Sequence, residues 1–148
     1  MKKKVINHFK ARFMSKSENE GFSRILITGF VSEFSPTVDE LADIKTIVSE
    51  AVTNSIVHGY KDSEGYITLE GIFYEDRLLK VVVTDKGVGI ENIEKAREPL
   101  FTTDPLSERT GMGFSIMECF TDKLIVKSSP GKGTRVEMRK KLSLRENI

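Results

Sequence analysis

The sequence lacks the features that would place the protein outside the reducing interior of a cell. It has one cysteine, Cys119, so no disulfide can form within the chain. No apolar stretch follows the first residues, as a signal peptide would require, and no apolar run approaches the roughly 20 residues that span a bilayer. We therefore expect a cytoplasmic protein with no membrane partner.

The chain also has little net charge and no internal repeat. Its 23 basic and 22 acidic residues leave a net charge of +1, which is not the electrostatic signature of a nucleic-acid-binding protein. At 148 residues, with 39% hydrophobic residues, it has the common size of one globular domain with a buried core. We expect residues 1–148 to form a single domain whose partners are recognised by local shape and charge.

Hydrophobic periodicity predicts both helices and strands. Two capping-box patterns, Ser17 with Glu20 and Thr37 with Glu40, precede amphipathic stretches. The expected helices run from Ser17 to about Phe34, from Thr37 to Gly59 and from about Phe114 to Phe120, and the expected strands cover 5–13, 66–74, 78–84, 124–128 and 134–139. An isolated glycine inside the second strand, Gly71, predicts a bulge. This order of elements predicts an α+β fold, a two-layer sandwich with helices on one face of a mostly antiparallel sheet.

The stretch "TDKGVGI" places one carboxylate at the end of a strand, just ahead of two glycines. Asp85 shares the parity of the apolar residues in that strand, so its carboxylate should point inward. Its partner is either a backbone or serine donor of the protein, or the exocyclic amine of a ligand that lies beside Gly87 and Gly89. The bare pattern is also that of a tight turn.

Two common phosphate-binding loops are excluded. Asn92 stands where a dinucleotide-binding loop would have its third glycine. The only "GK" pair, at Gly131 and Lys132, has Val126 where a P-loop would have its first glycine. Any nucleotide site must therefore be built from other motifs.

Polar residues recur every fourth position near the end of the second expected helix. Glu50, Asn54 and His58 form one polar seam beside the apolar stripe of the helix. This seam is either a solvated face or a reactive site. An asparagine oxygen suits Mg²⁺ when phosphates and water fill its other positions. A neighbouring glutamate can take a proton from an attacking hydroxyl. We expect His58 to cap or pack against the helix end rather than to act in catalysis.

A glycine pair, Gly111 and Gly113, precedes the last expected helix. Free amides at that helix end predict an anion site, and the same glycines also suit a flexible hinge. The preceding stretch, "EPLFTTDPLSERTG", is rich in proline, serine and threonine and predicts a lid over about 91–112. Arg109 within it is placed to meet a terminal phosphate.

Together with the turn "GKGT", which holds Gly131, Gly133 and Thr134, these motifs resemble in chain order the N, G1, G2 and G3 boxes of the GHKL ATPase superfamily, which includes gyrase and histidine kinases. Within that superfamily, "SEAVTNSIVHGY", "PLFTTDP" and "ERTGMGFSIMECF" resemble the anti-sigma F factors of endospore-forming bacteria, a family of serine kinases that act on an anti-anti-sigma protein. The general stress sigma B kinases are similar but match less well in the lid.

The resemblance implies a Bergerat-type ATP-binding fold that takes ATP or ADP with Mg²⁺. Asp85 would accept the adenine amino group with help from Thr134, Asn54 would hold Mg²⁺, and Glu50 would be the general base, while Arg109 would steady the γ-phosphate. The implied nucleotide-binding residues are Asn54, Asp85, Gly87, Gly89, Thr103, Gly111, Gly113 and Thr134.

The resemblance also implies protein partners. These are a sigma factor of the F type, an anti-anti-sigma factor as phosphorylation substrate, and a second copy of the chain in a homodimer. Arg24 falls at a position that the family uses to engage its partners, although a surface arginine is also commonly just solvated. Three alternatives to this kinase stay open. They are a non-catalytic module that binds ATP and sequesters a sigma factor, a kinase of the sigma B type, and a gyrase-like clamp, which the absence of a transducer domain disfavours.

Overall fold

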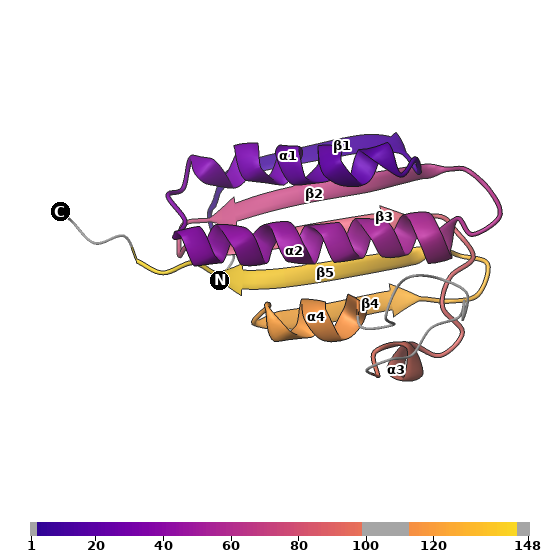
Figure 1. The fold of residues 1–148 in the computed structure, drawn as a ribbon. Helices are drawn as coiled ribbons and strands as arrows, with labels where there is room; N and C mark the ends of the chain where they lie inside the picture. Colours follow the sequence, from indigo (N-terminus) through magenta and orange to yellow (C-terminus); the bar gives the residue numbers. More distant parts are fainter. Residues whose placement is uncertain (1–2, 99–112, 145–148) are drawn as a thin grey trace.

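The fold has two layers, with helices over one face of a single sheet (Figure 1). The computed structural model describes residues 3–98 and 113–144. The strands are β1 (Val5–Met14), β2 (Tyr66–Tyr74), β3 (Leu78–Asp85), β4 (Lys123–Ser128) and β5 (Thr134–Lys141). The helices are α1 (Glu18–Ser32), α2 (Val38–Asn54), α3 (Ile93–Ala96) and α4 (Gly113–Cys119), and a π-helical segment, η1 (Ser55–Gly59), continues α2. The predicted α+β fold is confirmed.

The sheet has the order β1-β2-β3-β5-β4, and each neighbouring pair is antiparallel. Both predicted hairpins, β2–β3 and β4–β5, are present. The central strand β3 ends at Asp85, which pairs with Ile67 on one side and with Thr134 on the other. The sheet therefore brings the "TDKGVGI" loop and the "GKGT" turn to the same end of neighbouring strands.

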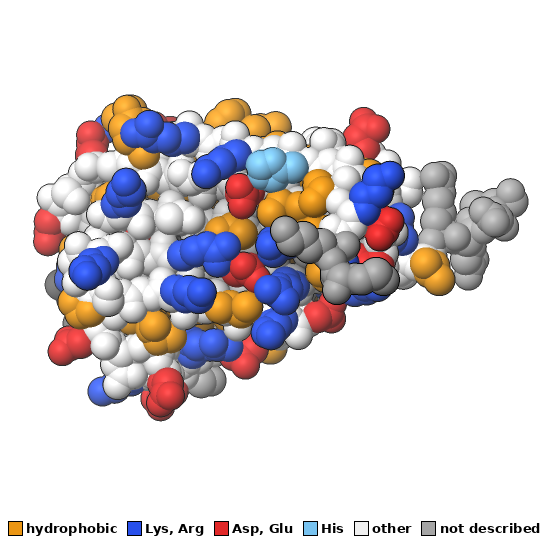
Figure 2. Space-filling model, turned by 180° about the vertical axis from the view of Figure 1, so that it is seen from behind, with side chains coloured by type: hydrophobic (Ala, Val, Ile, Leu, Met, Phe, Trp, Pro, Cys, Tyr) orange, Lys and Arg blue, Asp and Glu red, His pale blue; other side chains and the backbone are white. Residues whose placement is uncertain are grey.

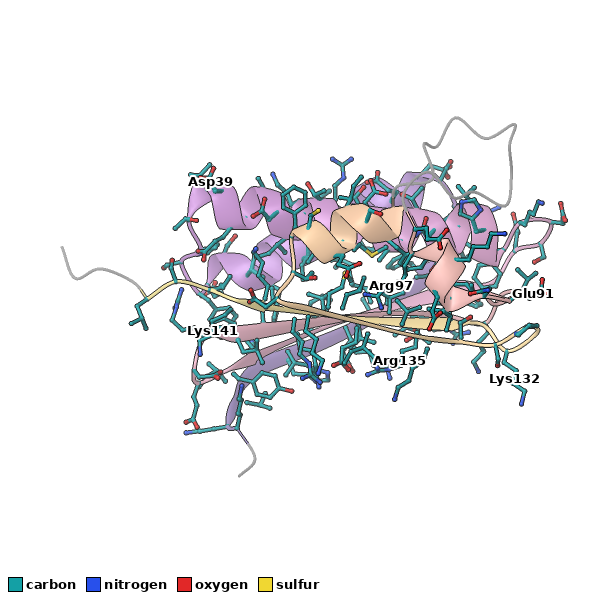
Figure 3. The ribbon with its side chains drawn as sticks, turned by 90° about the horizontal axis from the view of Figure 1, so that it is seen from below. Asp39, Glu91, Arg97, Lys132, Arg135 and Lys141 are labelled. Carbon is teal, nitrogen blue, oxygen red and sulfur yellow. The ribbon has the colours of Figure 1, made fainter. Side chains whose placement is uncertain are left out.

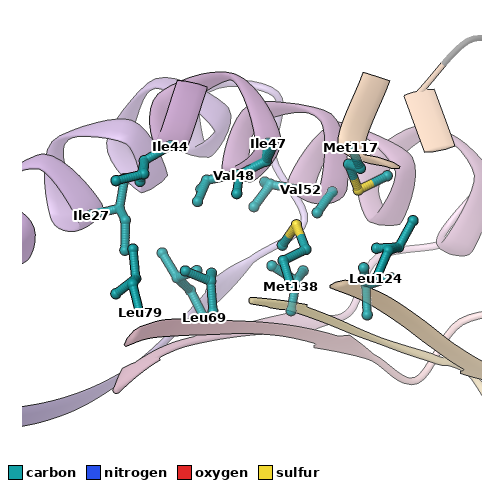
Figure 4. Close-up of a cluster of buried hydrophobic side chains, with 14 of the residues drawn as sticks. Ile27, Ile44, Ile47, Val48, Val52, Leu69, Leu79, Met117, Leu124 and Met138 are labelled. Atoms are coloured by element: carbon teal, nitrogen blue, oxygen red, sulfur yellow. The ribbon is translucent and has the colours of Figure 1, made fainter. Parts of the chain in front are cut away.

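An apolar core fills the space between the layers (Figure 4). Strand residues alternate between the core and the open face, as a half-buried strand requires. The largest fully buried side chains include Ile27, Ile44, Ile47, Leu69, Leu79, Met117 and Met138. Burial of each such side chain contributes about 1.5–3 kcal/mol. This core fixes α1, α2 and α4 on the sheet.

Only one of the two predicted capping boxes forms. Thr37 accepts a hydrogen bond from the amide of Glu40, and the Glu40 carboxylate accepts one from the amide of Thr37. Ser17 is wrong as a side-chain cap, because its own backbone is already helical and its hydroxyl donates to Glu18 instead. Glu20 is engaged by Arg24 and Ser49 rather than by Ser17.

The bulge predicted at Gly71 is also wrong. The β1–β2 register is continuous there and shifts only between Val5 and Asn7. A Cβ added to Gly71 would lie 2.5 Å from a ring carbon of Phe9, so the absent side chain leaves room for the aromatic packing of Phe9 against Phe30. The glycine serves close packing, not a change in strand register.

The other face of the sheet carries many lysine and arginine side chains (Figure 2). In Figure 3, Arg135 points away from the helices, and Glu91 and Lys132 lie at the end of the molecule where the loops meet. Glu137 is buried on the open face, and although burial alone would raise its pKa, hydrogen bonds from Arg139 and Arg135 hold that pKa below its ordinary value. Across 3–98 and 113–144, no helix is both long and apolar enough to span a bilayer.

Candidate functional site

A cavity of about 1120 Å³ lies where the end of α2, the loop after β3, the start of α4 and the start of β5 meet. Among the sequence-predicted site residues, it is lined by Asn54, Asp85, Gly89, Gly113 and Thr134. Its other lining residues include Ser55, His58, Lys61, Ile90, Asn92 and Lys95. A hollow of this size accommodates a nucleotide.

Asp85 lies at the wall of this cavity and is almost completely buried, with 4% of its surface exposed. One carboxylate oxygen accepts a 2.7 Å hydrogen bond from the Ser55 hydroxyl, and the other accepts a 2.9 Å bond from the amide of Gly87. Burial raises the pKa of Asp85 above its ordinary value, and the bonds from Gly87, Ser55 and the amide of Thr134 partly offset this rise. Both expected kinds of protein donor are therefore present, and three donors on four lone-pair positions leave one lone pair of the carboxylate for a ligand.

The wide turn of η1 brings α2 against Asp85. The first residue of η1 is Ser55, whose hydroxyl reaches the carboxylate, and its last residue is Gly59. A Cβ added to Gly59 would lie 3.0 Å from the Asp85 carboxyl carbon, so a larger residue would press on the acid. Single π-helical turns inside α-helices occur frequently at functional sites, and this one lines the cavity.

Glycines let three backbone segments approach one another beside the cavity. A Cβ on Gly87 would lie 2.0 Å from the carbonyl oxygen of Gly59, and one on Gly89 would lie 2.0 Å from that of Ser129. Gly133 meets the carbonyl of Asp85 in the same way, at 2.1 Å. Gly87 thus packs on protein backbone, whereas Gly89 also lines the cavity. Their predicted contact with a base stays a prediction.

Two hydroxyls at the β4–β5 turn join these loops. The Ser128 hydroxyl lies 2.8 Å from the Thr134 hydroxyl, from the carbonyl oxygen of Gly133 and from the amide nitrogen of Ile90. Ser128 and Ser55 are polar contacts of the site that the motifs did not single out. The signal available was the position of each serine, one directly after Asn54 and the other at the end of a strand.

The predicted polar seam reaches the first residue of α4. A Cβ added to Gly113 would lie 3.0 Å from the Asn54 side-chain nitrogen, 3.2 Å from its oxygen and 3.2 Å from a carboxylate oxygen of Glu50. Glu50, Asn54 and Gly113 are therefore neighbours, and His58 lines the cavity one turn further along.

A dedicated metal cage is absent from the part of the chain that the structure describes, since no three His, Cys, Asp or Glu side chains cluster there. The amide oxygen of Asn54 fits a different kind of site. It is a hard, neutral ligand of the type that Mg²⁺ accepts when phosphate and water oxygens complete its shell.

Of the other predicted residues, one lies away from the cavity and three are not described. Arg24 is half-exposed on α1, where it pairs with Glu20 at 2.9 Å and does not line the cavity. Thr103, Arg109 and Gly111, with most of the predicted lid, fall outside the described residues.

Comparisons with known proteins show the family of the chain. The family model of the histidine kinase-like ATPase domain matches residues 23–140. The anti-sigma F factor of Clostridium acetobutylicum is 50% identical over 141 residues, covering 95% of this chain and 98% of the relative. That of Geobacillus thermodenitrificans is 48% identical over 137 residues, covering 93% and 94%.

Solved structures show the same fold at lower identity. The RsbU and RsbW domains of a Mycobacterium tuberculosis protein match with a TM-score of 0.69 and 17% identity, covering 96% of this chain and 34% of that one. A histidine kinase domain from Erythrobacter litoralis matches with a TM-score of 0.54 and 22% identity, covering 71% and 46%.

Proposed function

Because the chain belongs to the anti-sigma F factor family within the histidine kinase-like ATPases, we propose that it is an ATP-dependent protein serine kinase. Its substrate is a serine of an anti-anti-sigma factor, and it also binds and inhibits a sigma factor of the F type. The observation that carries this proposal is the convergence of Asn54, Asp85 and Thr134 around one cavity, with Glu50 beside Gly113 at its edge.

The adenine end of the nucleotide lies against Asp85 in this proposal. The carboxylate is buried and already fixed by the Ser55 hydroxyl and by the amides of Gly87 and Thr134, so it is oriented before a ligand arrives. Its remaining lone pair accepts a hydrogen bond from the amino group of adenine, and Thr134 lies beside it on the paired strand. Such preorganisation lowers the entropic cost of binding.

The phosphate end lies toward Asn54 and Gly113. Asn54 would hold Mg²⁺ through its amide oxygen, and the ion would neutralise charge on the β- and γ-phosphates. The backbone beside Gly113 is bare and faces the seam residues, which suits close approach of phosphate oxygens. Thr103, Arg109 and Gly111 complete this end by the family resemblance.

Phosphoryl transfer requires a nucleophile and a base. The Glu50 carboxylate takes the proton of the incoming serine hydroxyl while the serine oxygen bonds to the γ-phosphorus and the bond to the ADP oxygen breaks. Histidine autophosphorylation fits poorly because of where the two histidines of the chain lie. His8 lies on the edge strand β1 and pairs with Glu70, and His58 lies within the cavity wall.

The partner surface in this proposal is the exposed side of α1. Arg24 lies on this helix, which also carries two exposed apolar side chains, Phe22 at 45% and Ile25 at 69% exposure. An exposed cation and exposed apolar groups on one helix suit a partner that offers both a carboxylate and an apolar patch. We further propose that residues 1–148 act as one domain, as a homodimer and in the cytoplasm.

A phosphorylation assay tests the proposal. The chain is incubated with ATP, Mg²⁺ and the anti-anti-sigma protein, and phosphoserine on that protein is measured by mass spectrometry. We expect Glu50→Gln to keep nucleotide affinity and to slow transfer by about 10²–10⁴-fold, the usual contribution of a general base. Asp85→Asn should weaken ATP binding first. Absence of phosphoserine with the unaltered chain, despite ATP binding and sigma-factor binding, would leave a non-catalytic sequestering module.

The pH dependence of binding tests the role of Asp85 separately. The adenine amino group donates to the ionised carboxylate, so protonation of Asp85 competes with ATP. Because burial raises this pKa above the ordinary 3.8, affinity should fall with decreasing pH earlier than for an exposed aspartate. Asp85→Asn should lose this component of the pH dependence. An identical pH profile in both proteins would remove Asp85 from nucleotide recognition.

A further inference from the structure

Ser128, the last residue of β4, contacts both glycine loops beside the cavity. Its hydroxyl oxygen lies 2.8 Å from the amide nitrogen of Ile90, which belongs to the loop after β3. The same oxygen lies 2.8 Å from the carbonyl oxygen of Gly133 and 2.8 Å from the Thr134 hydroxyl oxygen. Ser128 is absent from the cavity wall, whereas Ile90 and Thr134 line it.

Only one arrangement of protons satisfies all three contacts. A serine hydroxyl has one proton and two lone pairs. The Ile90 amide can only donate, so it occupies one lone pair, and the Gly133 carbonyl can only accept, so it takes the proton of Ser128. The remaining lone pair of Ser128 must therefore accept the proton of the Thr134 hydroxyl.

This arrangement decides what Thr134 offers to a ligand. With its proton committed to Ser128, the Thr134 oxygen has only lone pairs left for the cavity. Asp85, its partner across the β3–β5 ladder, is an acceptor as well while it is ionised. The cavity wall at this point therefore presents two neighbouring acceptors, which match a ligand edge that carries an amino group.

We propose that Ser128 is a positioning residue for base recognition, because it fixes the Thr134 hydroxyl as an acceptor and makes the site selective for purines with a 6-amino group. A 6-oxo purine would place a third acceptor against Asp85 and Thr134, and such a contact is repulsive. The inference rests on the proposed function, since it requires that adenine occupies this part of the cavity.

The test compares two nucleotides on the full chain. Affinities for ATP and for purine riboside triphosphate, which lacks the 6-amino group, are measured by calorimetry for the unaltered protein and for Ser128→Ala, Thr134→Val and the double variant. We expect Ser128→Ala to weaken ATP binding roughly three- to tenfold, as for loss of one hydrogen bond, and to leave the 6-deamino nucleotide nearly unchanged. In the Thr134→Val background the Ser128→Ala effect should disappear.

A matched control separates this role from a loss of packing. Ser23 is fully buried and donates to the carbonyl of Glu20 at 2.6 Å, outside the cavity wall, so Ser23→Ala should change neither affinity. Should Ser128→Ala not fold, Ser128→Thr retains the hydroxyl and is expected to retain the discrimination, while Thr134→Val alone should lose it.

The outcomes are distinguishable. Equal weakening of both nucleotides by Ser128→Ala, or an undiminished effect in the Thr134→Val background, would show that Ser128 only braces the loops and would overturn the inference. Discrimination that survives Thr134→Val would do the same. Failure of the unaltered chain to bind either nucleotide would instead refute the proposed function.

Discussion

At its N-terminal end α2 is fixed by a capping box and packed against the sheet, whereas at its C-terminal end the same helix widens into η1 and borders a cavity. The residues that face the sheet change accordingly. Along α2 itself, the buried residues are all apolar and lie in the core: Ile44, Ile47, Val48, Ala51 and Val52. Ser55 at the far end is buried against the carboxylate of Asp85.

The two ends show how one helix supports both stability and chemistry. Apolar burial needs no particular partner atoms, so the core-facing side of α2 depends on filled volume and tolerates volume-conserving apolar substitutions best. A buried carboxylate requires donors at defined positions, and the π-helical turn supplies one by moving Ser55 to Asp85. The C-terminal end of α2, at the cavity, is therefore determined by individual contacts. The N-terminal end, which we call the closed end, is determined by the volume of its packed side chains. Substitutions at the two ends should consequently have different effects.

The largest effect on stability is expected at the closed end. Ile44→Ala should lower the free energy of unfolding by about 2–5 kcal/mol, because the side chain has no exposed surface and the cavity left behind is only partly refilled. Val38 on the same helix is 86% exposed, so Val38→Ala should stay within about 0.5 kcal/mol. Denaturant unfolding measures both. Equal changes in the two variants would contradict the division of α2 into two ends.

A middle-sized effect is expected at the cavity end from Gly133→Ala. Gly133 has a φ of +80°, and a Cβ there would lie 2.1 Å from the carbonyl oxygen of Asp85, so backbone strain and a steric clash add. We expect Gly133→Ala to lower the free energy of unfolding by about 1–3 kcal/mol. It should also weaken ATP binding, because Asp85 must move. Gly131 has a φ of +76° but open space around it, so Gly131→Ala measures the backbone strain without the steric clash.

Gly29 completes this series as a control in α1. It lies inside a helix with no atom within 4 Å of an added Cβ, so Gly29→Ala should stabilise the protein by about 0.5–1 kcal/mol. Thermal unfolding and ATP titration of the three variants rank them. If Gly133→Ala lowers stability and ATP affinity no more than Gly131→Ala does, the close contact of Gly133 with Asp85 does not restrict the residue at position 133.

Much of the fold follows from local pattern, and the site follows only in part. Burial alternates along β2, and every second residue of β3 from Leu79 to Asp85 is buried, so the inward direction of Asp85 could be predicted from parity. The seam of Glu50 and Asn54 was visible because helical spacing is regular as far as Asn54. These are properties of single elements.

The contacts between elements could not be predicted from the same patterns. The partner of Asp85 depends on the π-helical turn, which shifts the helical register after Asn54. The three contacts of Ser128 join segments that are 5 to 38 residues apart in sequence. The packing of Gly71 against Phe9 likewise arises across two strands, which is why a bulge was the wrong interpretation.

The smallest expected destabilisation comes from the N-terminal caps, where two similar sequence patterns gave different structures. The Thr37 hydroxyl accepts from the Glu40 amide at 3.0 Å, so Thr37→Ala should destabilise the protein by about 1 kcal/mol. Ser17 makes no capping bond, so Ser17→Ala should stay within about 0.5 kcal/mol. Neither residue lines the cavity, so both changes should leave ATP affinity unaltered. Equal destabilisation by the two substitutions, measured by denaturant unfolding, would show that Ser17 caps α1 in solution and that the sequence pattern was the better guide there.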